Sequence, residues 1–364
     1  MPASAVCRRV CSTIKQYTCH EPQSGAWHAD CICVRMRARF RVPILREPIV
    51  NTLRLSCLAL AAALASGLAP AAPFAYVPNE KSGTVSVIDA ATDTVIRQIA
   101  AGKRPRGIAA DPSGRTLYVT DAASNELLVI DIASGVTMRH IALGKSPEGV
   151  NASPDGRLVA VAVEESNSVT LIDARSGAVL ADIKVAGKNP EHAAFSPDSR
   201  WLLVSAEEAE QVDVIDVAAR RQSGAVAVGL RPRGIGFAPD GGRAYVACEL
   251  ASAVYVIDMG TLKAVARVPA GKNSNGIAVH PGGGQVYVSN GIDANVMVID
   301  TASATVSATI AVGKRPWNMA LTPDGARLYV ANGRSNSVSV IDTATAAKVA
   351  DLPVGELPWG VVIR

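Results

Sequence analysis

Aromatic side chains are scarce in this 364-residue chain, where Phe, Trp and Tyr make up 4% of the residues. A core built on aromatic clusters is therefore excluded, and the 49% of hydrophobic residues predict a mostly aliphatic interior. Cysteine is scarce where a folded domain is expected, because six of the seven cysteines lie at or before Cys57 and only Cys248 follows. A domain with one cysteine cannot close an internal disulfide.

The chain also lacks a basic surplus after its first 72 residues. Nine of the 36 Lys and Arg but only three of the 32 Asp and Glu precede residue 73, so the remainder has a net charge of −2, against +4 for the whole chain. A mildly acidic domain is not expected to bind duplex nucleic acid, whose phosphates need a basic surface. Helical periodicity of useful length is absent too, which excludes a helical solenoid.

The first 72 residues have the features of an export signal. Residues 55–69 form a short apolar run that follows Arg54, and Ala69-Pro70-Ala71 offers small residues for cleavage. This is the plan of a secretory signal, and the run is too short for a comfortable membrane span. We expect residues 36–72 to be the signal region and residues 1–35 to be an extension that is removed or never translated. The product is expected in the periplasm, without a membrane span.

Residues 73–364 consist of one repeated motif. Four β-like runs fill each period; between residues 104 and 145 they are expected at 107–111, 116–120, 126–131 and 136–143. A period of about 42 residues with four such runs is typical of a β-propeller blade. The triplet Val/Leu-Ile-Asp marks the third run at steps of 42 or 43 residues, ending at Asp89, Asp131, Asp173, Asp216, Asp258, Asp300 and Asp342.

The repeat count predicts an all-β fold, a seven-bladed β-propeller of four-stranded blades. Seven Ile-Asp runs are present, but the proline turn between the first and second runs recurs only six times. The first repeat begins at its second strand, in residues 73–79, and the chain ends on an innermost strand, in residues 358–364. The C-terminal strand is therefore expected to join the N-terminal blade and close the ring without an open edge.

A second motif, Tyr-Val-x-Asn, stands at residues 76–79, 287–290 and 329–332. With Pro-Asp-Gly and Val-Ile-Asp, it resembles the YVTN-repeat β-propeller family over residues 73–364. The stretches RPWNMALTPDGARLYVANGRSNSVSVID and VGELPWGVVI resemble the propellers associated with pyrroloquinoline-quinone-dependent alcohol catabolism. That resemblance implies an exported accessory protein that works beside quinoprotein dehydrogenases and a transport system, without a defined reaction of its own.

Function is expected where the blades differ. The loop from the outermost strand of one blade to the innermost strand of the next lies at the mouth of the central channel. These loops share the pattern Gly…Pro-x-Gly, which is scaffold. His192 replaces the last glycine of one loop and belongs to the candidate ligand-binding site. The other candidates are the variable residues after the proline position: Arg106, Glu148, Glu191, Arg233, Asn275, Trp317 and Trp359.

Charged residues beside these candidates suggest the class of ligand. Lysines and arginines of the same loops, with Glu164, Glu207 and Glu249 of the neighbouring loops, predict a basic inner ring and an acidic sector outside it. Such a ring favours a small anion, for example a carboxylate, a phosphate or a quinone. The alternatives are a solvated rim of mixed charge and ion pairs that tie the blades together. His192 and Glu191 offer too few ligands for a metal site, so neither a metal nor a cofactor is predicted.

Three functions compete. The absence of a catalytic constellation favours a monomeric binding or scaffold protein that holds a partner protein or a small anionic ligand, so no enzyme activity and no catalytic residue is predicted. A propeller hydrolase of the lactonase type is the alternative, with Glu148, Glu191, His192 and Arg233 as its candidates. A quinoprotein dehydrogenase is rejected, because such enzymes usually have eight blades and an adjacent cysteine pair that this chain lacks.

Overall fold

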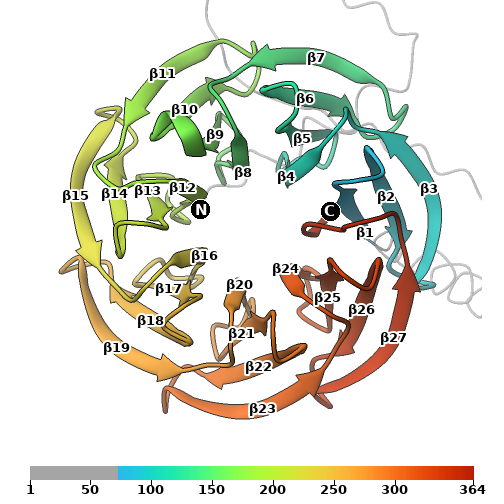
Figure 1. Ribbon diagram of the computed structural model, residues 1–364, viewed down its shortest axis with the longest axis vertical. Coiled ribbons are helices and arrows are strands. Elements are labelled where there is room, and N and C mark those ends of the chain that lie inside the picture. Colours follow the sequence, from blue (N-terminus) through green and yellow to red (C-terminus); the bar gives the residue numbers. More distant parts are fainter. Residues whose placement is uncertain (1–72) are drawn as a thin grey trace, which may run out of the picture. The chain divides into compact units, whose positions relative to one another are not determined.

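The computed structural model describes residues 73–364, which form a ring of seven four-stranded antiparallel sheets (Figure 1). The expected signal region, residues 36–72, and the extension before it, residues 1–35, lie outside the described residues. Within the described part no helix is long and apolar enough to span a membrane, and helical backbone is confined to a 3-10 turn, η1 (Glu164–Ser166). The predicted all-β propeller is therefore confirmed.

The blades follow one another in chain order, with the first strand of each nearest the axis and the fourth at the rim (Figure 1). The first blade contains β28 (Val362–Ile363), β1 (Phe74–Asn79), β2 (Thr84–Asp89) and β3 (Thr94–Ala100). The second contains β4 (Pro105–Ala110), β5 (Thr116–Asp121), β6 (Glu126–Asp131) and β7 (Thr137–Ala142). The third contains β8 (Pro147–Ala152), β9 (Leu158–Val163), β10 (Ser168–Asp173) and β11 (Val179–Lys184).

The remaining blades repeat this plan. The fourth contains β12 (Pro190–Phe195), β13 (Trp201–Ala206), β14 (Gln211–Asp216) and β15 (Arg221–Ala227). The fifth contains β16 (Pro232–Phe237), β17 (Arg243–Cys248), β18 (Ala253–Asp258) and β19 (Lys263–Pro269). The sixth contains β20 (Ser274–Val279), β21 (Gln285–Asn290), β22 (Asn295–Asp300) and β23 (Thr305–Ala311). The seventh contains β24 (Pro316–Leu321), β25 (Arg327–Asn332), β26 (Ser337–Asp342) and β27 (Ala347–Pro353).

Strands of the second blade lie within two residues of their expected bounds. The two middle strands, β5 and β6, are buried on both faces because each blade packs between two neighbours. The outermost strand β7 is mostly exposed. Asp131 caps the turn that follows β6, since its Oδ1 accepts hydrogen bonds from the backbone N–H and the hydroxyl of Ser134 at 2.8 Å and 2.6 Å.

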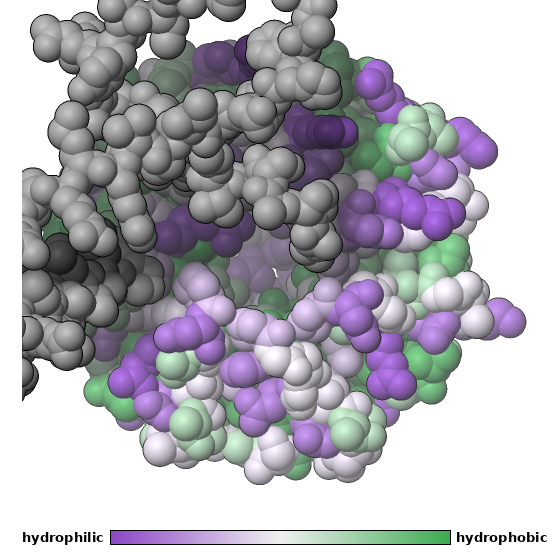
Figure 2. Space-filling model, turned by 180° about the vertical axis from the view of Figure 1, so that it is seen from behind, coloured by the Kyte–Doolittle hydropathy of each residue, from purple (hydrophilic) through white to green (hydrophobic). Residues whose placement is uncertain are grey.

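The core is divided into seven hydrophobic clusters, one between each pair of adjacent blades. Valine, isoleucine, leucine and alanine supply most of each cluster, and Tyr287 and Tyr329 are the largest side chains that are fully buried. The predicted aliphatic interior is therefore confirmed. Where the described residues are visible in Figure 2, hydrophilic side chains are interspersed with small hydrophobic areas.

The ring closes as predicted, through the last strand of the chain. In the first blade β28 pairs antiparallel with β1, where Ala75 faces Ile363 and Tyr76 faces Val362. Phe74 and Arg364 exchange backbone hydrogen bonds of 2.6 Å and 3.0 Å. Ile363 also belongs to the hydrophobic cluster between the seventh and first blades. The C-terminal strand therefore completes the N-terminal blade.

Candidate functional site

A β-bulge in each full-length innermost strand directs the variable residue toward the channel mouth. In β4 the register shifts between Pro105 and Ile108, so that Arg106 and Gly107 both stand opposite Thr120. The same shift occurs in β8, β12, β16, β20 and β24. A bulge turns a side chain out of the regular alternation of the strand. The repeat therefore presents one chosen side chain per blade at the same end of the channel.

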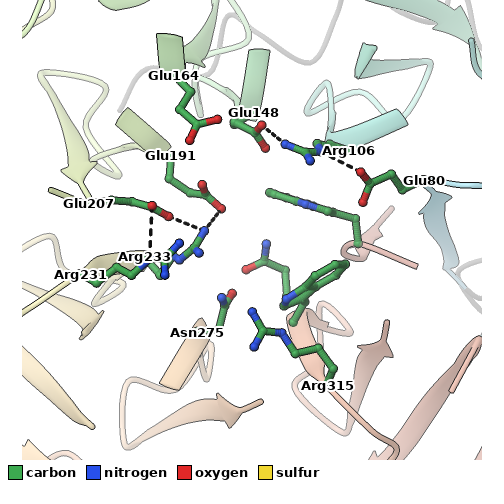
Figure 3. Close-up of a pocket in the computed structure, with 13 residues that line it drawn as sticks. Glu80, Arg106, Glu148, Glu164, Glu191, Glu207, Arg231, Arg233, Asn275 and Arg315 are labelled. Atoms are coloured by element: carbon green, nitrogen blue, oxygen red, sulfur yellow. Dashed lines mark hydrogen bonds and ion pairs between the residues drawn. The ribbon is translucent and has the colours of Figure 1, made fainter. Parts of the chain in front are cut away.

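Seven of the eight candidate residues lie around one cavity of about 250 Å³ (Figure 3). Loops that follow the second strands of three blades contribute to the wall, and so do loops that precede two innermost strands. His192 is the candidate that does not line this cavity. The complete lining is Glu80, Arg106, Glu148, Glu164, Glu191, Glu207, Arg231, Arg233, Asn275, Arg315, Trp317, Asn318 and Trp359.

Four carboxyl groups form one side of the cavity, here called the acidic wall: Glu148, Glu164, Glu191 and Glu207. Glu148 is 1% exposed, and Glu191 and Glu207 are each 7% exposed. One carboxylate oxygen from each of Glu164, Glu191 and Glu207 lies within 4.8 Å of the other two. The hydroxyl of Ser146 lies 3.1 Å from Glu148 Oε1 and 3.0 Å from Glu164 Oε2. Carboxyl groups this close repel one another when ionised.

Two arginines from the ring of variable residues compensate part of this charge. Arg106 pairs with Glu148 of the next blade, and its Nε lies 3.1 Å from Glu80 Oε1. Arg233 pairs with Glu191 and Glu207 of the preceding blade. These contacts cross from one blade to another, so the predicted alternative of ion pairs between blades is realised. Such pairs, held by planar guanidinium groups, also fix the positions of the carboxylates.

One further carboxylate, that of Glu249, is shared by three arginines. Glu249 is 2% exposed and lies 2.9 Å from Arg233 Nε, 3.3 Å from Arg231 Nε and 3.3 Å from Arg315 Nη2. Arg231 has a second partner in Glu207 at 3.3 Å. In the described part of the chain, Arg315 pairs with Glu249 alone. Positive charge therefore exceeds negative charge locally around Arg315.

The opposite side of the cavity carries indole and amide groups. The rings of Trp317 and Trp359 lie 6.5 Å apart at an angle of 50°, and the Arg315 guanidinium lies 5.8 Å from the Trp317 ring. Asn275 is 4% exposed and lies beside the Arg315 guanidinium in Figure 3. A flat apolar surface with nearby hydrogen-bond donors suits a ligand that has both apolar and polar parts.

Below the cavity two side chains meet across the central channel. Most blades have glycine one position after the variable residue, because neighbouring backbones approach closely: a Cβ at Gly149 would lie 2.7 Å from Glu191 O. His192 and Asn318 replace this glycine in β12 and β24, on opposite sides of the axis (Figure 1). His192 Nε2 and Asn318 Nδ2 are 2.9 Å apart. This bridge forms a floor under the cavity.

The histidine of this bridge is held firmly. Its ring stacks on Trp359 with a centroid distance of 5.4 Å and an angle of 16°. Its Nδ1 is buried without a hydrogen-bond partner. Burial lowers the pKa of His192 to about 4, since burial disfavours the charged imidazolium more than Glu191 favours it. A neutral histidine one layer below the cavity has a positioning role in the floor.

Burial and repulsion shift the pKa values of the acidic wall in opposite directions. Burial raises the pKa of Glu148 to about 9 and that of Glu207 to about 8, and in both cases the charge of Glu191 adds to the rise. Burial also acts upward on Glu191, but the positive charge of Arg233 brings the pKa of that carboxyl below its ordinary value. The wall therefore retains protons at neutral pH while Glu191 is ionised.

The charge pattern differs from the predicted basic inner ring. Lysines of the channel-mouth loops are exposed, and none of them lines the cavity. Carboxylates occupy the interior instead, because the first residue after the second strand turns inward in three blades, at Glu80, Glu164 and Glu207. A long lysine side chain gains more from hydration at the rim than from burial beside arginines. The basic residues that line the cavity are four arginines.

Sequence reasoning noted several lining residues without placing them in the site. Glu164 and Glu207 were assigned to an outer acidic sector, and Asn318 was overlooked. A signal for Asn318 existed, because it breaks the glycine pattern at the same position as His192. A signal for Glu80 existed too, because it directly follows the Tyr-Val-x-Asn motif of residues 76–79, at the position that Glu164 and Glu207 hold in their blades.

Comparison with protein families identifies two kinds of β-propeller. The model described as "YNCE-like beta-propeller" matches residues 45–137 and 129–228, which together span half of the chain. The model described as "Lactonase, 7-bladed beta-propeller" matches residues 218–349. A search of the curated proteins found no match.

Several solved structures share the fold. Hydrazine synthase from Kuenenia stuttgartiensis is 25% identical with a TM-score of 0.69, over 74% of this chain and 92% of that chain. A protein of unknown function from Desulfotomaculum acetoxidans is 18% identical with a TM-score of 0.72, over 80% and 98%. The dihydro-heme d1 dehydrogenase NirN, solved in complex with DHE, is 16% identical with a TM-score of 0.59, over 79% and 74%.

Proposed function

Because the chain belongs to the YNCE-like β-propeller family, whose fold supports many functions, we propose that it is a binding protein whose cavity holds a small ligand at the channel mouth. The observation that carries the proposal is the convergence of seven variable residues on one cavity of about 250 Å³. Positions that only support the blade have no reason to differ, whereas these residues differ from blade to blade.

The ligand is proposed to be a small molecule with an anionic group and a flat apolar part. Arg315 provides the contact for the anion, because its ion pair to Glu249 is 3.3 Å long and that carboxylate is shared with two other arginines. Burial lowers the pKa of Arg315, and the charges of neighbouring arginines such as Arg233 act in the same direction, which supports its role as the anion contact. The indoles of Trp317 and Trp359 provide the apolar surface.

The biological setting is proposed from the sequence. The signal-like pattern of residues 36–72 supports export to the periplasm, and the resemblance to propellers of pyrroloquinoline-quinone-dependent alcohol catabolism supports an accessory role beside that pathway and its transport system. A partner protein would dock on the same face, around the cavity mouth. Pyrroloquinoline quinone, which is flat and carries carboxylates, is accordingly one of the ligands to test.

Tryptophan fluorescence tests the proposal directly. The purified protein is titrated with pyrroloquinoline quinone and with small carboxylates, with correction for the light that the quinone absorbs. We expect a saturable change that disappears in Trp317→Ala. Arg315→Gln should weaken binding at least about tenfold, because a charged hydrogen bond contributes roughly 1.5–3 kcal/mol.

Trp201→Phe is the matched control. Trp201 begins β13 at the opposite end of its blade, away from the cavity, so its replacement should leave the titration unchanged. Absence of a saturable change with every probe would reject a small-molecule site at the channel mouth. Cross-linking to a partner protein would then test the scaffold role of the same face.

A lactonase-type hydrolase is the second candidate, favoured by the family match over residues 218–349. Glu148 would be the proton donor, since burial raises its pKa to about 9 and keeps it protonated at neutral pH. His192 does not suit this chemistry, because it lies in the floor and does not line the cavity. Lactone hydrolysis that is lost in Glu148→Gln would favour the enzyme over the binding protein.

A further inference from the structure

Two exposed loop positions at the channel mouth differ from blade to blade. One is the residue after the first glycine of each loop that enters an innermost strand, and the other is the second residue after each second strand. Backbone hydrogen bonds hold the two positions side by side. Ile292 N donates to Lys272 O at 3.2 Å in the sixth blade, and Arg334 N donates to Lys314 O at 3.1 Å in the seventh. The residues at these two positions are therefore neighbours.

Opposite charges occupy the two positions in three blades, the first, third and fourth. The pairs are Lys81 with Glu356, which form an ion pair of 2.7 Å, Lys145 with Glu165, and Lys188 with Glu208. The second blade has Lys103 beside Ala123. In the fifth, sixth and seventh blades, which are adjacent in the ring (Figure 1), no acidic residue stands at either position. This basic-aliphatic sector consists of Leu230 with Leu250, Lys272 with Ile292, and Lys314 with Arg334.

The aliphatic side chains of this sector are exposed to solvent. Leu230, Leu250 and Ile292 are 48%, 59% and 62% exposed, and none of them lines the cavity. The other large hydrophobic side chains that are exposed between residues 73 and 364 lie on or beside outermost strands. Leucine or isoleucine replaces polar or charged residues here without entering the core. Such exposed aliphatic side chains on neighbouring loops indicate a contact surface.

The basic side chains of the sector are not neutralised by neighbouring carboxylates. Lys272, Lys314 and Arg334 are exposed, and none of them has an ion pair among residues 73–364. Asp293 is the one exposed acidic residue in the channel-mouth loops of these three blades, and its Oδ2 accepts a hydrogen bond from Lys272 N at 2.8 Å. The same loops of the third and fourth blades expose three glutamates and two lysines. Positive charge is therefore concentrated in the sector that carries the aliphatic side chains.

We propose that the basic-aliphatic sector binds the surface of an anionic lipid membrane. Lysine and arginine side chains are attracted to anionic headgroups, and the leucine and isoleucine side chains beside them enter the boundary between headgroups and acyl chains. A bilayer needs no shaped groove, which suits side chains that lie on separate loops. Leucine is under-represented among the residues that dominate binding between proteins, so a partner protein fits this sector less well. Membrane binding goes beyond the small-ligand function and does not require it.

Co-sedimentation with lipid vesicles tests the proposal. Residues 73–364 are used, because the ring has its own hydrophobic clusters and closes on itself, whereas the arginines and the apolar run before residue 73 would themselves bind anionic vesicles. We expect binding to vesicles of phosphatidylcholine and phosphatidylglycerol in equal amounts, which salt weakens, and little binding to phosphatidylcholine alone. Lys272→Gln combined with Lys314→Gln should weaken binding at least about tenfold, because each basic residue contributes roughly a fivefold change in affinity. Leu250→Gln should weaken it about tenfold, since an aliphatic side chain no longer leaves water.

Two matched controls remove the same kinds of group elsewhere. Lys145→Gln combined with Lys188→Gln removes two exposed lysines from the same loop position in blades where a glutamate stands beside each. Val265→Gln removes an aliphatic side chain that is 56% exposed on the outermost strand β19. Both controls should bind anionic vesicles with nearly unchanged affinity. The proposal is overturned if the unchanged ring does not bind anionic vesicles, if it binds neutral vesicles equally well, or if the controls weaken binding as much as the sector variants do. Because no organic ligand is present, a negative fluorescence titration would leave this result unaffected.

Discussion

Removal of the last seven residues, 358–364, tests how the ring is closed. Among the side chains that this truncation deletes are those of Trp359, Val361 and Ile363, which are 8%, 8% and 4% exposed. Burial of one such side chain contributes about 1.5–3 kcal/mol, so the truncation should cost roughly 5–9 kcal/mol, before the lost hydrogen bonds to β1 are counted. A domain has about 5–15 kcal/mol of stability in total. We therefore expect most or all of the ring to unfold.

Urea unfolding followed by far-ultraviolet circular dichroism measures this effect without depending on the deleted tryptophan. A point variant gives a milder version: Ile363→Ala should lower the free energy of unfolding by about 2–4 kcal/mol. Val349→Ala is the control, because Val349 lies on the outermost strand β27 with 51% exposure and its truncation should cost less than about 0.5 kcal/mol. A truncated protein as stable as the full chain would refute closure by β28.

Three further outcomes follow from buried groups. Burial lowers the pKa of His192 to about 4, below the unfolded value of about 6.5. The free energy of unfolding should therefore fall by up to about 3 kcal/mol as the pH drops from 6.5 toward 4. Urea titrations of His192→Gln should lack this dependence of stability on pH. Burial raises the pKa of Cys248 to about 12, so peptide mass spectrometry should find it alkylated by iodoacetamide only in urea, and labelling of the native protein would contradict its burial. Gly149→Ala should cost at least about 2 kcal/mol because its Cβ would lie 2.7 Å from Glu191 O, whereas Gly284→Ala, with no atom within 4 Å, should cost little.

The fold was predictable because its determinants are local and repeated. Asp131 predicts a capped turn from its own sequence neighbourhood, and the structure has that turn. Seven copies of the pattern average out the ambiguity of any one strand. Ring closure needed only a count of strands at the two ends, since an unpaired edge in the first blade had to be covered by the last residues. Strand bounds differed by one or two residues, where pairing rather than sequence defines the end of a strand.

The sequence predicted seven of the thirteen residues that line the cavity, but not their contacts. Comparison of equivalent positions identified the seven variable residues, because a repeat shows directly which residues the scaffold does not require. Their pairing was not predictable: His192 and Asn318 are 126 positions apart and meet because two blades separate them on one side of the channel and three on the other. Which arginine neutralises which carboxylate depends on the inward turn of loops such as that of Glu207.

Departures from the repeat explain both the shape and the charge of the cavity. A glycine next to the variable residue leaves the central channel open at that blade. In the two blades without this glycine, His192 and Asn318 bridge the channel and form the floor of the cavity. The same logic applies to charge, because glutamates follow the second strand in adjacent blades at Glu164 and Glu207, whereas glycines stand there in the sixth and seventh blades. A symmetric scaffold cannot distinguish one side of a ligand from the other. The acidic and indole sides of this cavity can, and both arise from substitutions that leave the blades unchanged.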